Sequence, residues 1–254
     1  MSLKKLIPRP IRKLIRPAID RVPVTIEYRP LRSEWPGEKK RIEYQKRYVK
    51  FDIQPNDRVL DIGSGSDPFP YATHLADRFL DPTEHRHGQL IKGDRLIGAD
   101  IHALPFRDKS FDFVYCAHIL EHVENPLKAC AEIMRVGKRG YIETPTMGED
   151  VLFAWTFDIH KWHVVGCAQR LCFFEYTPRE SEGIRSTAWA DVIFGRRFHP
   201  LQPAFYDNQD VFNVMFTWNE SFTVHVFRND GTLESLNADV VPTGTTTHPQ
   251  LSLH

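Results

Sequence analysis

Residues 58–65 read Arg-Val-Leu-Asp-Ile-Gly-Ser-Gly, an apolar strand that ends at Asp61 and runs directly into a glycine-rich turn. Because Gly63 and Gly65 have no Cβ atoms, the backbone of this turn can press against a small ligand. The carboxylate at the end of the strand would then face a positive group of that ligand. The stretch therefore predicts a site for a nucleotide-like cofactor.

The position of the third glycine in a dinucleotide-binding fingerprint is held by Pro68. That third glycine normally lets a helix pack closely behind the turn, and the helix N-terminus then binds a pyrophosphate. A proline at this position argues against a coenzyme that carries a pyrophosphate. S-adenosylmethionine fits better, because it joins a nucleoside to an amino acid with an ammonium group and contains no phosphate.

The composition is that of an ordinary globular protein. Of the 254 residues, 41% are hydrophobic and 26% are charged. No apolar run approaches the ~20 residues that span a bilayer, and the start lacks a secretory signal pattern, so we expect a cytoplasmic protein. The four cysteines have neither zinc-finger nor CxxC spacing, and we expect buried, reduced thiols without a metal or a disulfide at Cys116, Cys130, Cys167 and Cys172.

The net charge of zero conceals a basic N-terminal segment, because residues 1–50 hold 15 Lys and Arg against 5 Asp and Glu. Leucine and isoleucine pairs alternate there with basic pairs, as in a segment that touches anionic lipid. A second interpretation is a solvated arm that folds back on the acidic remainder of the chain. The pattern leaves peripheral membrane contact open, and we expect no binding to nucleic acid.

Short apolar stretches and one well-marked helix follow one another along the middle of the chain. We expect an apolar element at 72–80 and strands at 96–101, 111–117, 140–143, 170–176 and 212–227. A helix is predicted between Asn125, as its N-cap, and Gly137, with Pro126 in its first turn. This alternation indicates a parallel sheet covered on both faces, with ligands at the carboxyl edge of its strands.

The order of the elements suggests three parts. A helix-like pattern at 41–51 ends before the turn Pro55-Asn56-Asp57, which we take as a boundary. We therefore expect a basic N-terminal arm and helix over 1–50, a main domain over 51–240 with an insertion at about 147–210, and a flexible tail over 241–254.

Three groups of residues resemble successive motifs of class I S-adenosylmethionine-dependent methyltransferases of the type 11 kind. They are Val59–Gly65, then Ala103–Phe106 with Phe111–Val114, and then His118–Val123. The resemblance implies a Rossmann-like α/β fold with a seven-stranded, mostly parallel sheet, helices on both faces, and an antiparallel last strand. The aromatic-rich stretch 212–227 suits that last strand.

The resemblance also implies which residues bind S-adenosylmethionine. Asp61 and the glycine turn would hold the methionine end, Asp77 the two ribose hydroxyls, and Asp100 the adenine amino group. In a second register Asp100 binds the ribose instead. The full set implied for the cofactor is Asp61, Gly63, Ser64, Gly65, Asp77, Asp100, Ile101 and Ala117.

Methyl transfer from a sulfonium is an in-line displacement, so most of the catalysis is alignment and desolvation. A hydroxyl acceptor has a high pKa and benefits from a general base. His118 follows the strand at 111–117 on the expected carboxyl edge, and an imidazole accepts protons near neutral pH. His118 is therefore the first candidate for the catalytic base.

A second candidate patch is His160-Lys161-Trp162-His163, which follows the strand at 140–143. His160 or His163 would remove a proton while Trp162 or Trp155 stacks on a ring of the acceptor. Histidines at the rim of a half-buried strand are the other interpretation. The aromatic-rich stretch 177–210 is interpreted as a lid over the acceptor or an oligomer contact.

His118, Glu121 and His122 are spaced so that they share one face if the segment is helical. Such a trio could hold a divalent cation, or it could be a purely structural cluster. We assign no metal to it.

These observations predict methyl transfer from S-adenosylmethionine to an oxygen of a small molecule or glycan. Two alternatives remain open. One is a non-catalytic module that binds a cofactor or partner with the same fold, and the other is a nicotinamide-dependent oxidoreductase, which Pro68 argues against. The sequence does not specify the acceptor.

Overall fold

The structure is a computed structural model that describes residues 41–82, 88–153, 160–185, 205 and 207–238. All of them belong to one unit of the chain, Pro36–His254. Most of the expected basic arm and the expected tail lie outside the described residues. Among the described helices, none is long and apolar enough to cross a membrane.

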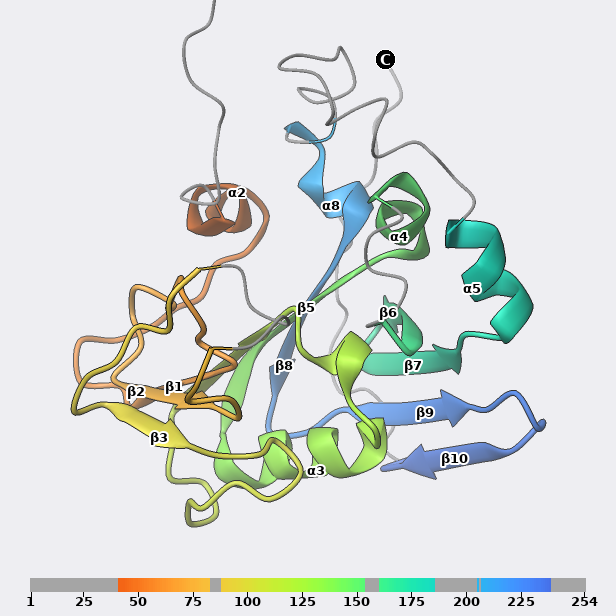
Figure 1. The fold of residues 1–254 in the computed structure, drawn as a ribbon. Helices are drawn as coiled ribbons and strands as arrows, with labels where there is room; N and C mark the ends of the chain where they lie inside the picture. Colours follow the sequence, from red (N-terminus) through yellow and green to blue (C-terminus); the bar gives the residue numbers. More distant parts are fainter. Residues whose placement is uncertain (1–40, 83–87, 154–159, 186–204, 206, 239–254) are drawn as a thin grey trace, which may run out of the picture. The chain divides into compact units, whose positions relative to one another are not determined.

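A mostly parallel sheet forms the centre of the fold (Figure 1). Its strands are β1 (Val59–Ile62), β2 (His74–Asp77), β3 (Leu96–Gly98), β4 (Phe113–Ala117), β5 (Arg139–Pro145) and β8 (Asn213–Asn219). They lie in the order β3-β2-β1-β4-β5-β8. Neighbours from β3 to β5 pair in parallel, and β8 pairs antiparallel to β5. The predicted α/β class with a mostly parallel sheet is confirmed, although this sheet has six described strands instead of the expected seven.

A second sheet has the order β10-β9-β7-β6. Its strands are β6 (Trp162–Cys167), β7 (Arg170–Glu175), β9 (Thr223–Phe227) and β10 (Leu233–Leu236). The prediction of a single strand at 212–227 was therefore wrong, because this stretch supplies β8 to one sheet and β9 to the other. Glu220 separates the two strands with a positive φ of 61°. A residue in this left-handed conformation interrupts an extended strand.

The predicted helix after Asn125 is α3 (Pro126–Val136). The Asn125 side chain accepts a hydrogen bond from the backbone N–H of Lys128 at 3.0 Å, which satisfies one donor of the first turn. The helix ends at Gly137, where a Cβ atom would lie 2.5 Å from Cγ2 of Val114. Sequence signals that are local to the helix therefore define both of its ends.

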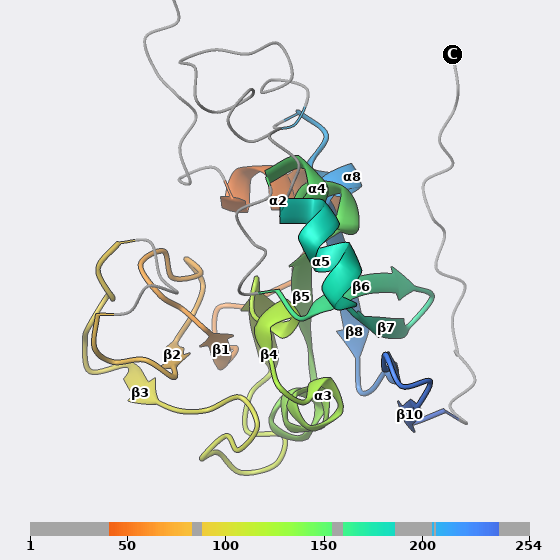
Figure 2. The same cartoon turned by 45° about the vertical axis from the view of Figure 1, so that its right-hand side comes forward.

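The other described helices are short. They are α2 (Arg41–Tyr48), the 3-10 turn η3 (Leu120–His122), α4 (Met147–Phe153), α5 (Pro178–Arg185) and α8 (Gln209–Phe212). Figures 1 and 2 show α2, α4 and α8 gathered at the end of the central sheet where β5 finishes and α4 begins. Because parallel strands end at the same edge, this is the edge where the candidate site residues follow β1, β2 and β4.

The two faces of the central sheet are covered differently. On one face, α3 and the second sheet bury a large cluster that includes Leu60 and Val114. On the other face, the chain after the glycine turn takes the place of a helix, and the ring of Phe69 stacks on that of Tyr115 with centroids 4.1 Å apart. The stretch at 67–70 is non-helical, as its two prolines predict.

The cysteines differ from the prediction in part. Cys116 and Cys130 are buried, whereas Cys167 is exposed and Cys172 is partly buried. The last two lie on the β6–β7 hairpin at the edge of the second sheet, where one face is open to solvent.

Candidate functional site

The glycine turn after β1 has the close packing that its sequence predicts. Gly63 and Gly65 have φ values of 75° and 51°, which are costly for residues with a Cβ atom. Gly63 donates a hydrogen bond from its N–H to the carbonyl of Ala76 at 2.7 Å. A Cβ atom at Gly63 would lie 2.0 Å from Cδ1 of Ile119, the residue after His118. The turn thus brings the ends of β1, β2 and β4 together.

Asp61 and Ser64 leave polar atoms at this turn that a ligand can use. Asp61 is 2% exposed, and its Oδ2 accepts a hydrogen bond from the backbone N–H of Phe69 at 2.8 Å. Burial raises the pKa of the Asp61 carboxyl to about 7, against an opposing effect of that hydrogen bond. Among the described residues, the buried Oγ of Ser64 has no hydrogen-bond partner. A buried hydroxyl without a partner among the described residues and a buried carboxyl beside it fit the amino-acid half of S-adenosylmethionine.

Asp77 and Asp100 follow β2 and β3 and differ in their surroundings. Asp77 is 8% exposed, and its two oxygens accept hydrogen bonds from the N–H groups of Gly65 at 3.1 Å and Phe79 at 2.8 Å. The Asp100 side chain is 37% exposed and accepts hydrogen bonds from His102. Burial acts to raise the pKa of Asp100, but the hydrogen bonds from His102 outweigh it and lower that pKa. Asp77 therefore ties the glycine turn to β2, while Asp100 has the more accessible carboxylate.

The remaining residues implied for the cofactor lie at the same edge. Ile101 follows Asp100 and is 7% exposed, and Ala117 is the last residue of β4 and is 5% exposed. Both contribute to the apolar surroundings of this edge.

His118 follows β4 and has a positive φ of 56°. Its Nε2 lies 3.1 Å from Oε1 of Glu143 on β5, and its backbone N–H donates to the Glu143 carbonyl at 2.8 Å. A non-glycine residue in this conformation is often found at functional sites, where the surrounding contacts hold it. The His118 side chain remains 33% exposed, so one side of the ring is open to a ligand.

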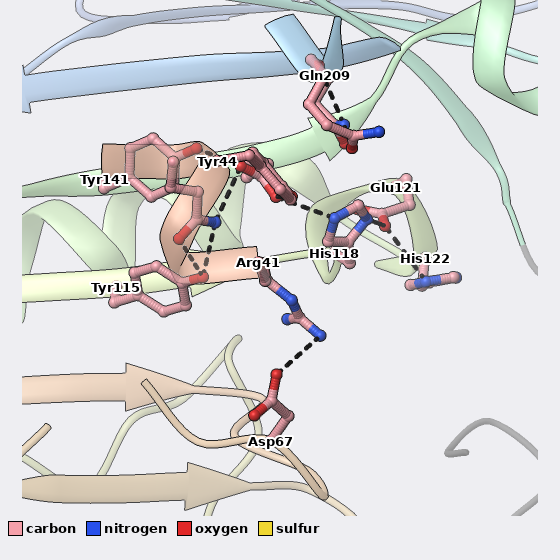
Figure 3. A network of polar contacts seen from close by, with 12 residues as sticks. Arg41, Tyr44, Asp67, Tyr115, His118, Glu121, His122, Tyr141 and Gln209 are labelled. Atoms are coloured by element: carbon pink, nitrogen blue, oxygen red, sulfur yellow. Dashed lines mark hydrogen bonds and ion pairs between the residues drawn. The ribbon is translucent and has the colours of Figure 1, made fainter. Parts of the chain in front are cut away.

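Glu143 is a fully buried carboxylate with several donors. Two of these donors, Tyr44 and Tyr141, are labelled in Figure 3. It accepts hydrogen bonds from the Tyr44 hydroxyl at 2.6 Å, from Nε2 of Gln45 at 3.0 Å and from the Tyr141 hydroxyl. Burial acts to raise the pKa of Glu143, but His118 and the tyrosine donors outweigh it and lower that pKa. The carboxylate is therefore held in its charged form beside His118.

Helix α2 takes part in this site, which the sequence did not predict. Tyr44 and Gln45 reach Glu143 from 99 and 98 residues away in the chain. Gln45 is fully buried and also bonds to the Tyr115 hydroxyl, and Arg41 of the same helix lies 3.9 Å from Asp67. The signal available in the sequence was the polar Gln45 within an apolar pattern, together with Glu143 in a buried strand.

A second group of polar side chains surrounds Glu121. Its carboxylate is fully buried and accepts no hydrogen bond from the described residues. The nearest ring nitrogens are Nε2 of His122 at 3.5 Å and Nδ1 of His118 at 3.7 Å. Burial raises the pKa of Glu121 well above its usual range, with nearby carboxylates such as Asp150 adding to the effect. The expected trio of His118, Glu121 and His122 lies together, and His118 also contacts Glu143 through Nε2. His160, which the spacing did not suggest, joins Glu121 and His122 as a third possible metal ligand.

The patch at 160–163 divides between two environments. His160 bonds through Nδ1 to Asp150 at 2.8 Å. Trp162 is 2% exposed and donates from Nε1 to the carbonyl of Val123 at 2.7 Å, so the prediction that it stacks on an acceptor was wrong. Its position on the inward face of β6 explains this burial.

His163 points to the other face of β6, since side chains alternate along a strand. Its ring lies beside those of Phe174 and Tyr176, and burial lowers its pKa. Its catalytic role stays a prediction. Trp155 and most of the predicted lid at 177–210 lie outside the described residues.

The sequence of the central part matches a known family. A family model described as a methyltransferase domain matches residues 60–142. A demethylmenaquinone methyltransferase from Renibacterium salmoninarum is 41% identical over 96 residues, which is 34% of this chain and 39% of that protein. An uncharacterized methyltransferase from Schizosaccharomyces pombe is 29% identical over 116 residues, or 38% of this chain and 40% of that protein. The chain thus spans about two fifths of the length of these relatives.

Solved structures with similar folds include the [4+2]-cyclase SpnF, with 13% identity and a TM-score of 0.38 over 84% of this chain and 95% of that chain. A SAM-dependent methyltransferase from Aquifex aeolicus has 16% identity and a TM-score of 0.29 over 41% of this chain and 63% of that chain. The assignment rests on the sequence match and on the glycine turn between β1 and β2. Residues 60–142 thus match the methyltransferase-domain family, and the resemblance to class I S-adenosylmethionine-dependent methyltransferases is confirmed.

Proposed function

We propose that the chain transfers a methyl group from S-adenosylmethionine to an oxygen of a small-molecule or glycan acceptor. The observation that carries this proposal is the His118–Glu143 pair, because a base held by a buried carboxylate suits the removal of a hydroxyl proton. Ile119, next to His118, contacts the glycine turn, so the base and the cofactor site are neighbours.

In this proposal the residues at the carboxyl edge bind and orient the cofactor. The turn at Gly63 and Gly65 lets the backbone approach the methionine part, and Asp61 faces its ammonium group. Asp77 or Asp100 accepts hydrogen bonds from the nucleoside. The cofactor, when bound, supplies an electrophilic methyl group on a positively charged sulfur.

Glu143 would act as a positioning residue for His118. The ionised carboxylate accepts a hydrogen bond from Nε2–H, which leaves Nδ1 as the basic nitrogen of the ring. The donors from Tyr44, Gln45 and Tyr141 keep this carboxylate charged and fixed. His118 would then take the proton of the acceptor hydroxyl as the methyl group is transferred.

Two measurements test this proposal in sequence. Isothermal titration should detect binding of S-adenosylhomocysteine and none of NADH. Incubation with labelled S-adenosylmethionine and fractionated cell extract should then label an acceptor. Demethylmenaquinone and simple phenols belong in the panel, because one of the relatives is named a demethylmenaquinone methyltransferase.

Variants separate catalysis from binding. His118→Ala and Glu143→Gln should each lower the transfer rate by about 100-fold or more, the range for a lost general base, while S-adenosylhomocysteine still binds. His225→Ala is the matched control, since His225 bonds to Ser235 within the second sheet. Cofactor binding without transfer to any acceptor would instead favour a non-catalytic binding module. Transfer that is unchanged in His118→Ala would exclude the assigned base.

A further inference from the structure

Glu121 presents an energetic problem that the proposed methyl transfer does not explain. Its carboxylate is fully buried, and neither oxygen accepts a hydrogen bond from the described residues. A buried carboxylate without donors is costly unless a cation or a proton compensates it. A cation held by neighbouring ligands is one form of this compensation.

The neighbours of Glu121 are suitable metal ligands. Glu121, His122 and His160 each offer one ligand atom, and these three atoms lie within 4.8 Å of one another. Two ligands of a tetrahedral zinc ion, each about 2.1 Å from the metal, stand about 3.4 Å apart. The separation between Oε1 of Glu121 and Nε2 of His122 is 3.5 Å, too long for a good hydrogen bond and close to that spacing.

His160 has the supporting contacts of a metal-binding histidine. Its Nδ1 lies 2.8 Å from Oδ1 of Asp150, which leaves Nε2 for an ion. Oδ2 of Asp150 in turn accepts a hydrogen bond from the Tyr176 hydroxyl at 2.6 Å. The side chains of His160 and Asp150 are 8% and 3% exposed. A carboxylate behind the ring fixes the tautomer and orientation of a histidine ligand.

The charge around the cluster also favours a cation. Two further buried carboxylates lie next to it, because Glu143 contacts His118 and Asp150 contacts His160. Glu149 also has a buried oxygen, Oε2, without a hydrogen-bond partner. A divalent ion would lower the free energy of this group of negative side chains.

We propose that Glu121, His122 and His160 bind one divalent transition-metal ion, with zinc as the ion that suits this donor set best. Two imidazoles and one carboxylate form a common three-residue zinc set, and they leave a fourth position for water or an acceptor oxygen. The His122 side chain is 33% exposed, so the site has access to solvent. This site is defined by different residues from the His118–Glu143 pair and does not depend on methyl transfer.

The test is zinc binding by the full chain without cofactor or acceptor. After treatment with EDTA and its removal, isothermal titration with Zn²⁺ should give one ion per chain. Cobalt should bind in the same place and give the visible absorption bands of a low-symmetry Co²⁺ site. Glu121→Gln and His160→Ala should each weaken zinc binding by at least tenfold. Asp150→Asn should weaken it by about 10–100-fold, as expected for a residue that supports a ligand.

Controls keep the outcome clear. His225→Ala removes a histidine of the second sheet and should bind zinc as the unmodified chain does. Glu121→Gln replaces a buried carboxyl with a neutral amide of nearly the same shape, so it should fold even if His160→Ala does not. Absence of stoichiometric binding by the unmodified chain would overturn the proposal. Equal binding by Glu121→Gln and the unmodified chain would overturn it as well.

Discussion

The side chain of Ile119 covers Gly63 so closely that its Cδ1 lies 2.0 Å from where a Cβ atom at residue 63 would stand. Gly63 follows β1, whereas Ile119 follows β4, so this contact joins the cofactor turn to the segment that carries His118. The glycine turn and the segment of the candidate base are therefore in direct contact, and a substitution at Gly63 or Ile119 should alter the position of the other residue.

Gly63→Ala should lower both stability and cofactor binding. The positive φ of 75° adds about 1–2 kcal/mol of strain for alanine, and the overlap with Ile119 adds about 1–3 kcal/mol. Denaturant unfolding and titration with S-adenosylhomocysteine measure the two effects. Gly93→Ala is the matched control, because a Cβ atom there meets nothing within 4 Å. Equal stability of the two variants would contradict the role of this contact.

Asp61→Asn should stabilise the folded chain at neutral pH. Burial raises the pKa of Asp61 from 3.8 to about 7, so the folded state favours the protonated carboxyl. The stability that this preference provides is present at low pH and is lost as pH rises through about 7. Thermal unfolding measures this effect: as the pH rises from 4 to 8, the melting temperature of Asp61→Asn should rise relative to that of the unmodified chain. A constant difference across this range would argue against a raised pKa.

The same substitution should weaken cofactor binding, because a cofactor ammonium group pairs with the ionised carboxylate. In the unmodified chain, affinity for S-adenosylhomocysteine should increase from pH 6 to 8 as Asp61 loses its proton. Arg41, Asp67 and Asp77 are the charged groups that also act on this carboxyl. Titrations of Asp61→Asn across this interval should show a smaller increase, and an identical increase would assign the pH dependence to another group.

Tyr44→Phe should destabilise the chain and slow the proposed transfer. It removes a hydrogen bond of 2.6 Å to the buried carboxylate of Glu143, and a bond to a charged group contributes about 1.5–3 kcal/mol. Tyr48→Phe is the control on the same helix, since Tyr48 is 43% exposed and its hydroxyl bonds only at the surface. Chemical denaturation compares the two. If Tyr48→Phe lowers the free energy of unfolding as much as Tyr44→Phe does, the packing of the helix, and not the hydrogen bond to Glu143, is responsible.

Features that depend on neighbouring residues could be predicted from the sequence. The ends of α3 are marked by its own cap residues, Asn125, Pro126 and Gly137. The tight turn after β1 requires a positive φ, which the glycine at residue 63 adopts easily. The double strand at 212–227 was missed because the chain changes sheets at Glu220, which is neither glycine nor proline. No local pattern marks such a change of direction.

Contacts between distant segments could not be predicted in this way. Tyr44 meets Glu143 because α2 lies at the carboxyl edge of β5, and this packing depends on the whole sheet. His160 joins Glu121 for the same reason, since the residues just before β6 lie beside the turn that follows β4. Spacing along a helix suggested His118 as a partner of Glu121, and Nδ1 of His118 does lie 3.7 Å from that carboxylate. The shorter contact of the same ring, from Nε2 to Glu143, could not be predicted from the spacing.

Asp77→Asn and Asp100→Asn should separate the two candidates for the ribose contact. Both oxygens of Asp77 accept hydrogen bonds from backbone N–H groups. In Asp77→Asn the NH₂ group of the amide would face one of these N–H groups, and the lost hydrogen bond should cost about 1–3 kcal/mol of stability. In Asp100→Asn the remaining oxygen can keep both hydrogen bonds from His102, and only the exposed ion pair with Arg78 is lost. Its stability should change by less than about 1 kcal/mol.

Affinity then assigns the contact. If Asp100 binds the ribose, Asp100→Asn should weaken binding of S-adenosylhomocysteine by about tenfold while leaving its 2′-deoxy analogue less affected, because that analogue lacks one of the hydroxyls. If Asp77 binds the ribose instead, the unmodified chain should bind S-adenosylhomocysteine more tightly than the 2′-deoxy analogue, and this difference in affinity should be lost in Asp77→Asn. Because Asp77 also holds Gly65 of the cofactor turn, Asp77→Asn should weaken both ligands in addition. A loss of the same size for both ligands in both variants would exclude either carboxylate as the hydroxyl acceptor.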